Sequence, residues 1–354
     1  MMEKSKEISL RVPNIFNYAT SELSQDAFIC WLLQWASSEF KDIDPKLNEC
    51  GTKFIDALFL RAGKSKPEHI DSIEIKKQIE NIDVLVLIKE ASGDTHAIII
   101  EDKTDTKHHS KQLERYYGIV RDKFKIAVQN IIPIYLKTGD QSSYSAIKEC
   151  GFFEFLRNDF LYLLQEGKAA GVNNAIFADF LSFLEKREHA VNKFKNEPIN
   201  VWAKKNNRAW SGFYIELKKE ISSGNWNYVA NQTGGFMGFW WAGKKVGNVT
   251  LYLLLAENQL YFKIGVKEGK PKTERNEWHN RICKAAKEHQ PSLQINKPDR
   301  FGSGKDMTVA VLKSEYLVPD SNGLLNLSET IKVLKECEAI LEAAISSFVE
   351  PTVQ

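Results

Sequence analysis

The chain has 354 residues, of which 43% are hydrophobic, 27% charged and 11% aromatic. This length and composition are typical of a soluble protein with two domains, or three small ones, and with full hydrophobic cores. No apolar run approaches the roughly 18 residues of a membrane span, no apolar signal segment follows the first residues, and the five cysteines form no CxxC pair. We therefore expect a cytoplasmic protein without a membrane anchor, a zinc site or a disulfide framework.

The net charge of +2 conceals a difference between two parts of the chain. Residues 1–199 hold 27 Lys and Arg against 30 Asp and Glu, whereas residues 200–315 hold 19 against 10. The second segment also carries six of the eight tryptophans. Cations interleaved with aromatic side chains suggest an anionic partner, since aromatic rings can stack on exposed bases. An ordinary surface of solvated lysines is the alternative.

The first half predicts helices, then a run of strands, then helices again. In chain order, the periodicity of apolar residues predicts helices at 14–40 and 46–62, strands at 73–79, 81–88 and 96–103, a helix at 110–124, a strand at 131–136, and helices at 152–166 and 174–190. The three strands follow one another through tight turns, so they form an antiparallel meander. This half is an α/β domain, assigned to residues 1–195.

A polar, lysine-rich stretch at 192–207 marks the boundary to the second half. The second half predicts a helix at 210–222, strands at 226–230, 238–242, 248–256 and 259–266, a helix at 273–288, a strand near 307–312 and a last helix at 328–348. We therefore assign residues 200–354 to a separate C-terminal α+β domain.

The chemistry of the chain is expected at two neighbouring strands. Alternation places Glu101 and Lys103 on the same face of their strand, with Asp102 on the other face, and Asp83 lies on the preceding strand. Carboxylates inside apolar strands are costly unless a cation compensates them, and hard oxygens suit Mg²⁺ or Mn²⁺. We expect Asp83, Glu101 and the main-chain carbonyl of Asp102 to bind one such ion. Lys103 can stabilise an attacking hydroxide and the charge on a phosphate.

Each of these residues also has a simpler interpretation. Asp83 alone could end a strand or cap a turn, and Glu101 with Lys103 could be an exposed ion pair of little energetic value. The combination favours an active site, because the polar residues interrupt two consecutive strands at positions that can meet in space.

The order of these residues resembles the PD-(D/E)xK nuclease superfamily. Asp83 and Glu101-Asp102-Lys103 occupy the second and third strands of a meander that follows a helix, with Ile82 where many members have proline. The resemblance covers about a third of the chain. It implies a restriction-endonuclease-like core of αβββαβ topology with a central four-stranded mixed sheet.

Two further elements of the superfamily have counterparts here. Glu22 matches a glutamate on the first core helix, in the form found in a bacterial branch, and that residue reaches the metal through water. Gln112 and Tyr116 match a Gln-x-x-x-Tyr element of the RecB-like and phage-exonuclease branch, and their spacing places both on one helix face, directed at the site. Asp26 shares the face of Glu22, either as surface charge or in a supporting role. His108 and His109 are either phosphate contacts or exposed loop residues.

These observations predict a Mg²⁺- or Mn²⁺-dependent nuclease that hydrolyses phosphodiester bonds, of DNA rather than RNA. A role in phage defence or genome maintenance follows by analogy only. The C-terminal domain is expected to bind substrate, a protein partner or a second copy of the chain. The alternatives are an RNA-directed nuclease, a catalytically silent nucleic-acid-binding or scaffold protein with a nuclease-like core, and a nuclease gated by a ligand sensor in the second half.

Overall fold

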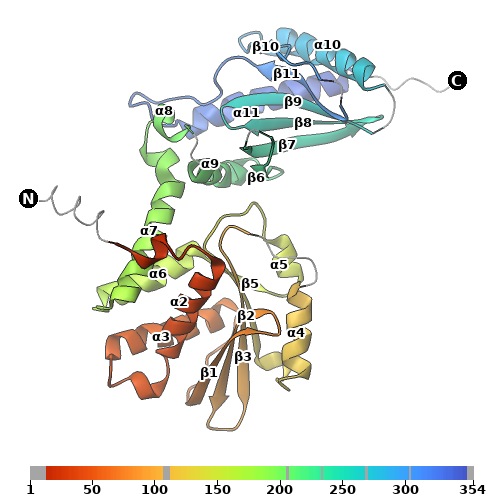
Figure 1. Cartoon of the computed structure of the whole chain (residues 1–354). Coiled ribbons are helices and arrows are strands. Elements are labelled where there is room, and N and C mark those ends of the chain that lie inside the picture. Colours follow the sequence, from red (N-terminus) through yellow and green to blue (C-terminus); the bar gives the residue numbers. More distant parts are fainter. Residues whose placement is uncertain are drawn as a thin grey trace, which may run out of the picture. The chain divides into compact units, whose positions relative to one another are not determined.

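The computed structural model (Figure 1) describes residues 13–106, 112–204, 207–232, 234–267, 270–302 and 304–348. The chain forms two compact units, Met1–Glu188 and His189–Gln354. The division falls within helix α7 (Ala175–Asn196), slightly before the sequence-predicted boundary at residues 195–200. Among the described ranges, none of the helices combines the length and the apolarity that crossing a membrane requires.

The first unit is organised around a five-stranded mixed sheet of order β1-β2-β3-β4-β5. Its strands are β1 (Ile70–Ile79), β2 (Ile82–Glu90), β3 (Thr95–Lys103), β4 (Ile131–Lys137) and β5 (Phe153–Leu156). The first three pair antiparallel as a meander, and β4 and β5 add parallel to β3. A parallel neighbour requires a crossover, which the helix between β3 and β4 provides.

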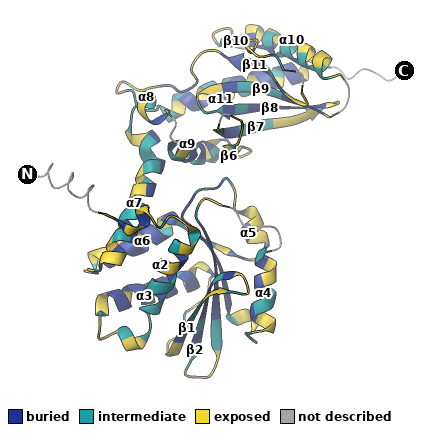
Figure 2. Ribbon diagram, viewed as in Figure 1, coloured by how far each residue is buried: buried dark blue, intermediate teal, exposed yellow. Residues whose placement is uncertain are grey.

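Helices cover both faces of this sheet (Figure 1). The helices are α2 (Glu22–Gln34), α3 (Pro45–Arg61), α4 (Gln112–Asp122), α5 (Ser145–Glu149), α6 (Arg157–Ala169) and α7. One core joins α2, α3, α6 and α7 to one face, and a smaller core joins α4 and α5 to the other. Because both faces are covered, β3 is buried along almost its whole length, as Figure 2 shows for the sheet.

The predicted αβββαβ topology is confirmed, but the prediction of four strands is one strand short. The fifth strand, β5, lies at the start of the region predicted as a single helix. It has four residues and passes directly into α6, whose N-cap is Leu156 and whose Asp159 carboxylate accepts a hydrogen bond from the Leu156 N–H. A strand this short, without a turn before the helix, gives no period of its own.

The second unit contains a six-stranded antiparallel sheet of order β10-β11-β9-β8-β7-β6. Its elements are α8 (Ile199–Trp202), α9 (Asn207–Glu220), β6 (Asn225–Val229), β7 (Phe236–Val246), β8 (Val249–Ala256), β9 (Gln259–Val266), α10 (Pro271–His289), β10 (Ile295–Asn296), β11 (Asp306–Leu312) and α11 (Leu327–Ser346). Buried and partly exposed residues alternate along β8, so one face of the sheet packs on the core that α9, α10 and α11 share.

The tryptophans of this unit belong mainly to its core. Five of the six in residues 200–315 are buried, namely Trp202, Trp210, Trp226, Trp241 and Trp278. The suggestion from the sequence that these rings stack on exposed bases is therefore wrong for these five. Their large apolar area instead fills the space between sheet and helices.

Candidate active site

The residues predicted to carry the chemistry lie together at one end of the first sheet. In the antiparallel register, Val84 of β2 pairs with Ile100 of β3, which places Asp83 beside Glu101. The side chains of Glu101 and Lys103 lie on the face covered by α4, and that of Asp102 lies on the face covered by α2. Glu101 and Asp102 are completely buried, and Lys103 is 7% exposed.

The ammonium of Lys103 is surrounded by the oxygens predicted to bind a metal ion. Its Nζ lies 2.6 Å from Glu101 Oε1, 2.7 Å from the Asp102 carbonyl and 3.2 Å from Asp83 Oδ2. Glu22 Oε2 follows at 3.9 Å. The Asp102 N–H also donates to Asp83 Oδ2, at 3.0 Å. Four oxygen-bearing groups from three elements therefore converge on a single cation.

Burial and like charge shape the titration of this group. Burial, together with the negative charge of Asp83, raises the pKa of Glu101 to about 7, although Lys103 opposes the shift. Burial acts to lower the pKa of Lys103, but the carboxylates of Glu101 and Asp83 outweigh it and raise that pKa. The site thus holds more negative charge than one lysine neutralises, which is an environment that favours an additional cation.

The carboxylate of Glu22 is oriented by the segment that follows β3. It accepts hydrogen bonds from the Thr104 N–H at 3.0 Å, from the Thr104 hydroxyl at 3.3 Å and from the Thr106 hydroxyl. Burial acts to raise the pKa of Glu22, but these hydrogen bonds outweigh it and lower the pKa. Glu22 is therefore held as an anion near Lys103, at the start of α2.

Gln112 and Tyr116 lie on one face of α4, as their spacing predicts. Gln112 Nε2 donates to the Tyr116 hydroxyl at 2.6 Å, and that hydroxyl donates to the carbonyl of Asn81 in the turn between β1 and β2. Tyr116 is fully buried. The pair therefore supports the turn that leads into Asp83. His108 and His109 lie outside the described residues.

A second group of polar residues lies behind the site, and sequence reasoning missed most of it. Gln25 Nε2 donates to Asp102 Oδ1 at 2.5 Å, and Gln25 Oε1 accepts from the Thr138 hydroxyl at 2.6 Å. Gln78 Nε2 donates to Asp26 Oδ2 at 3.0 Å and to Asp83 Oδ1 at 3.3 Å. The helical spacing from Glu22 to Gln25 and Asp26 was the available signal.

Lys137 was also missed, although it pairs with Lys103 in the parallel register of β3 and β4. Its side chain is completely buried, and its Nζ donates to the carbonyls of Thr104 and Thr106 at 3.0 and 2.6 Å. Burial lowers the pKa of Lys137 to about 8, against the attraction of Asp105 and Glu22. Lys137 thereby fixes the segment whose donors orient Glu22.

The donor set fits a hard divalent cation. Two carboxylates and a carbonyl already lie within 3.2 Å of one positive centre, and oxygen ligands of this kind are those that Mg²⁺ and Mn²⁺ prefer. Within the described part of the chain, no three His, Cys, Asp or Glu side chains gather as a ready metal cluster. A metal ion would therefore depend on the Asp102 carbonyl and on water for part of its coordination.

Comparison with known proteins agrees with this geometry. Residues 13–209 match a family described as PD-(D/E)XK nuclease superfamily. The match covers more than half of the chain and includes every candidate residue of the site. No curated protein and no solved structure is significantly similar to the chain. The match, the mixed sheet and the Asp83, Glu101 and Lys103 arrangement agree with one another, and the chain belongs to the PD-(D/E)XK nuclease superfamily.

Proposed function

We propose that the protein is a divalent-metal-dependent nuclease that hydrolyses phosphodiester bonds of DNA. The observation that carries this proposal is the convergence of Asp83, Glu101 and the Asp102 carbonyl on the ammonium of Lys103. Membership of the superfamily implies a nuclease. The metal, the choice of DNA over RNA and a role in phage defence or genome maintenance belong to the proposal.

The residues of the site have distinct roles in this function. Asp83, Glu101 and the Asp102 carbonyl would hold the metal ion directly, and Glu22 would hold it through water. When bound, a divalent ion polarises the phosphate and makes water a better nucleophile. Lys103 stabilises the negative charge that develops on the phosphate, since its ammonium is fixed by carboxylates and needs little reorganisation. Gln112 and Tyr116 hold the β1–β2 turn and thereby the start of β2.

The intact set of residues favours catalysis over a silent binding role. A fully buried carboxylate beside a second carboxylate is costly in a protein that makes no use of it. Lys103 is likewise held by several carboxylates, so its ammonium is already positioned to stabilise charge on a phosphate. A silent scaffold would gain nothing from this arrangement.

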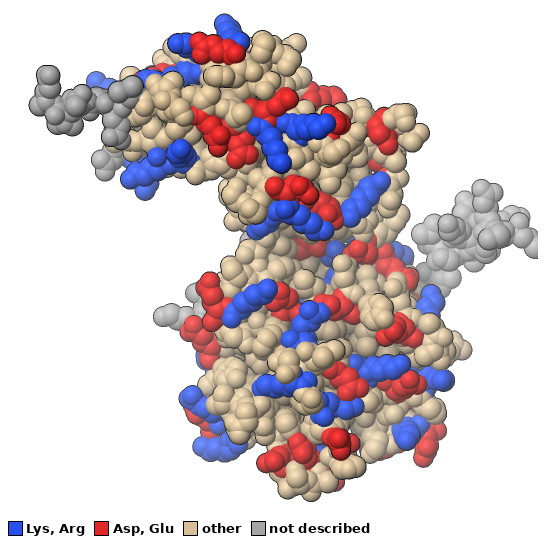
Figure 3. Space-filling view, turned by 180° about the vertical axis from the view of Figure 1, so that it is seen from behind, with Lys and Arg blue, Asp and Glu red and all other residues tan. Residues whose placement is uncertain are grey.

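The second unit is proposed to bind nucleic acid, a protein partner or a second copy of the chain. The segment 200–315 has 19 Lys and Arg against 10 Asp and Glu, a net positive charge that attracts phosphates. On the face shown in Figure 3, cations and anions are interspersed. This distribution counts against a continuous basic face on that side of the unit, so binding there would use scattered phosphate contacts.

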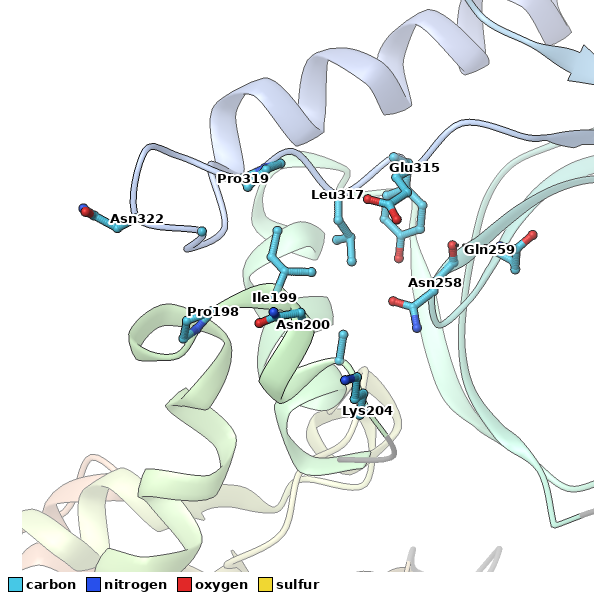
Figure 4. A pocket seen from close by; sticks show the side chains of 13 residues that line it. Pro198, Ile199, Asn200, Lys204, Asn258, Gln259, Glu315, Leu317, Pro319 and Asn322 are labelled. Carbon is cyan, nitrogen blue, oxygen red and sulfur yellow. Dashed lines mark hydrogen bonds between the residues drawn. The ribbon is translucent and has the colours of Figure 1, made fainter.

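A second candidate role for this unit is a ligand sensor, which a cavity of about 680 Å³ favours. It lies between α8, the β8–β9 turn and the segment after β11, and Figure 4 shows Lys204, Asn258 and Glu315 around it. Its volume is in the range of small-molecule sites, and Leu317 and Ile199 add apolar surface. Thermal shifts of the full chain with nucleotides and amino acids would test this role, and it fails if no ligand stabilises the protein or if Asn258→Ala leaves every shift unchanged.

The nuclease proposal is tested by incubating the purified full chain with Mn²⁺ or Mg²⁺ and four substrates: linear, circular and single-stranded DNA, and RNA. We expect metal-dependent cleavage of at least one DNA and none by Asp83→Ala. Cleavage of RNA alone would show that the substrate is RNA and not DNA. Nucleic-acid binding without cleavage under any metal would favour the silent alternative.

A further inference from the structure

The buried carboxyl group of Asp102 has no part in the proposed chemistry, which uses only its carbonyl. Asp102 is completely inaccessible to solvent, and its side chain lies on the sheet face covered by α2. Burying a carboxyl group is costly unless hydrogen bonds satisfy it. Gln25 on α2 supplies one at 2.5 Å, and Thr138, directly after β4, in turn donates to Gln25 at 2.6 Å.

The other oxygen of Asp102 belongs to a pair of carboxyl groups. Asp26 Oδ1 and Asp102 Oδ2 are both buried, and within the described residues neither receives a hydrogen bond from another kind of group. The two carboxyl groups interact with each other. This interaction joins helix α2 to strand β3.

Gln78 extends the connection from Asp26 to the site. Its amide donates to Asp26 at 3.0 Å and to Asp83 at 3.3 Å. Gln78, near the end of β1, has a φ of 53°, and Glu80 and Asn81 in the turn that follows have φ values of 53° and 64°. Non-glycine residues in this left-handed region are strained, and such strain persists only where the surroundings hold it. The surroundings therefore hold the turn between β1 and β2 in this conformation.

We infer that Gln25, Asp26, Gln78 and Asp102 form a positioning clamp for the active site. This inference rests on the proposed nuclease function. A continuous chain of contacts runs from Thr138 through Gln25, Asp102, Asp26 and Gln78 to Asp83. The clamp fixes α2, and with it Glu22 one turn earlier, against the strands. It also orients Asp83, whose Oδ1 accepts from Gln78 and whose Oδ2 accepts from the Asp102 N–H.

The clamp requires hydrogen bonding at Asp102 but no negative charge. In Asp102→Asn, the amide oxygen can still accept from Gln25 and the amide nitrogen can donate to Asp26. In Asp102→Leu, the shape is similar but both hydrogen bonds are lost. The two substitutions therefore separate positioning from a direct role of the carboxylate.

The test measures Mn²⁺ affinity and amide hydrogen exchange in the full chain for Asp102→Asn, Asp102→Leu and Gln78→Ala, with Glu74→Ala as the control. Glu74 is an exposed residue of the same strand, β1, and pairs with Lys76. Asp102→Leu should weaken Mn²⁺ binding about tenfold to a hundredfold, as lost supporting contacts of metal sites do. Gln78→Ala should weaken it about fivefold, in line with the loss of its hydrogen bond to Asp83. Glu74→Ala should stay near the wild type, and Asp102→Asn should retain more Mn²⁺ affinity than Asp102→Leu.

Hydrogen exchange separates this inference from the proposed function. In the wild type, the main-chain amide of Asp102 donates to Asp83. In Asp102→Leu and Gln78→Ala, the main-chain amide at this position should exchange faster even without metal. If the wild type neither binds Mn²⁺ nor cleaves DNA, the proposed function fails, and exchange alone decides on the clamp. If Asp102→Leu does not fold, Gln78→Ala decides, since Gln78 is exposed. Asp102→Asn as damaging as Asp102→Leu, or wild-type exchange in both Asp102→Leu and Gln78→Ala, would overturn the clamp.

Discussion

In the first unit, charged side chains are buried at the ends of β3 and β4 and on α2, α6 and α7, whereas the described interior of the second unit is apolar except for Ser211 and Thr330. Buried charge lowers stability unless it is paired, so a fold keeps it where chemistry needs it. Among the described residues of the second unit, no charged side chain is buried in this way. We therefore expect its function at its surface or its cavity, and substitutions in the two units should have different effects.

The largest expected effect is a loss of stability in the second unit. Trp210 is completely buried and packs against Trp202, with ring centroids 4.8 Å apart. Trp210→Ala should lower the free energy of unfolding by about 3–5 kcal/mol, because it leaves a large cavity. Urea denaturation measures this, with the partly exposed Trp240→Ala as the milder control. Weaker DNA binding at unchanged stability would show that Trp210 stacks on bases instead.

In the first unit, Lys103→Ala should slow DNA cleavage and leave the protein folded. Lys103→Ala removes a charge that acts mainly in the transition state, so single-turnover cleavage should slow by about a hundredfold or more. Mn²⁺ binding should persist, because Asp83 and Glu101 remain. If Lys103 had only a structural role in its buried ion pairs, the variant would cleave at the wild-type rate and lose about 3–5 kcal/mol of stability.

The surface of the second unit should affect affinity and leave the chemical step unchanged. Lys244 and Lys245 are exposed on β7. Replacing both with alanine should lower DNA affinity about tenfold and reduce the salt dependence of binding by about one to two phosphate contacts, at an unchanged single-turnover rate. The control is Lys168→Ala, at an exposed position of α6. DNA binding that is independent of salt would contradict this role.

A pH-dependent change in stability is expected at Lys137. Its folded pKa is about 8, below the ordinary value of 10.5. Between these values the unfolded chain binds more protons, so this group makes unfolding less favourable as pH rises from about 8 to 10.5. The stability of the wild type relative to Lys137→Met should increase over this range in thermal denaturation. A difference in stability between the two proteins that does not change with pH would mean that burial does not lower the pKa of Lys137.

The sequence predicted the positions of the site residues better than the contacts of the residues that support them. Period-two alternation predicted the shared face of Glu101 and Lys103, and the meander placed Asp83 beside them. Neither pattern reports a contact across distant elements, such as Gln78 with Asp26 or Gln25 with Asp102. Gln78 reaches both carboxylates from the end of β1, beside a turn with positive φ angles that no glycine signals. β5 was missed for a related reason, since a strand of four residues directly before a helix gives no pattern of its own.

The most direct test of the central claim is Mn²⁺ titration of the wild type and Asp83→Ala, followed by DNA cleavage with the same samples. The account predicts that the wild type binds Mn²⁺ and cleaves DNA, and that Asp83→Ala loses both properties while its thermal unfolding stays close to that of the wild type. An Asp83→Ala protein that still binds Mn²⁺ and cleaves at the wild-type rate would contradict the assignment of this site.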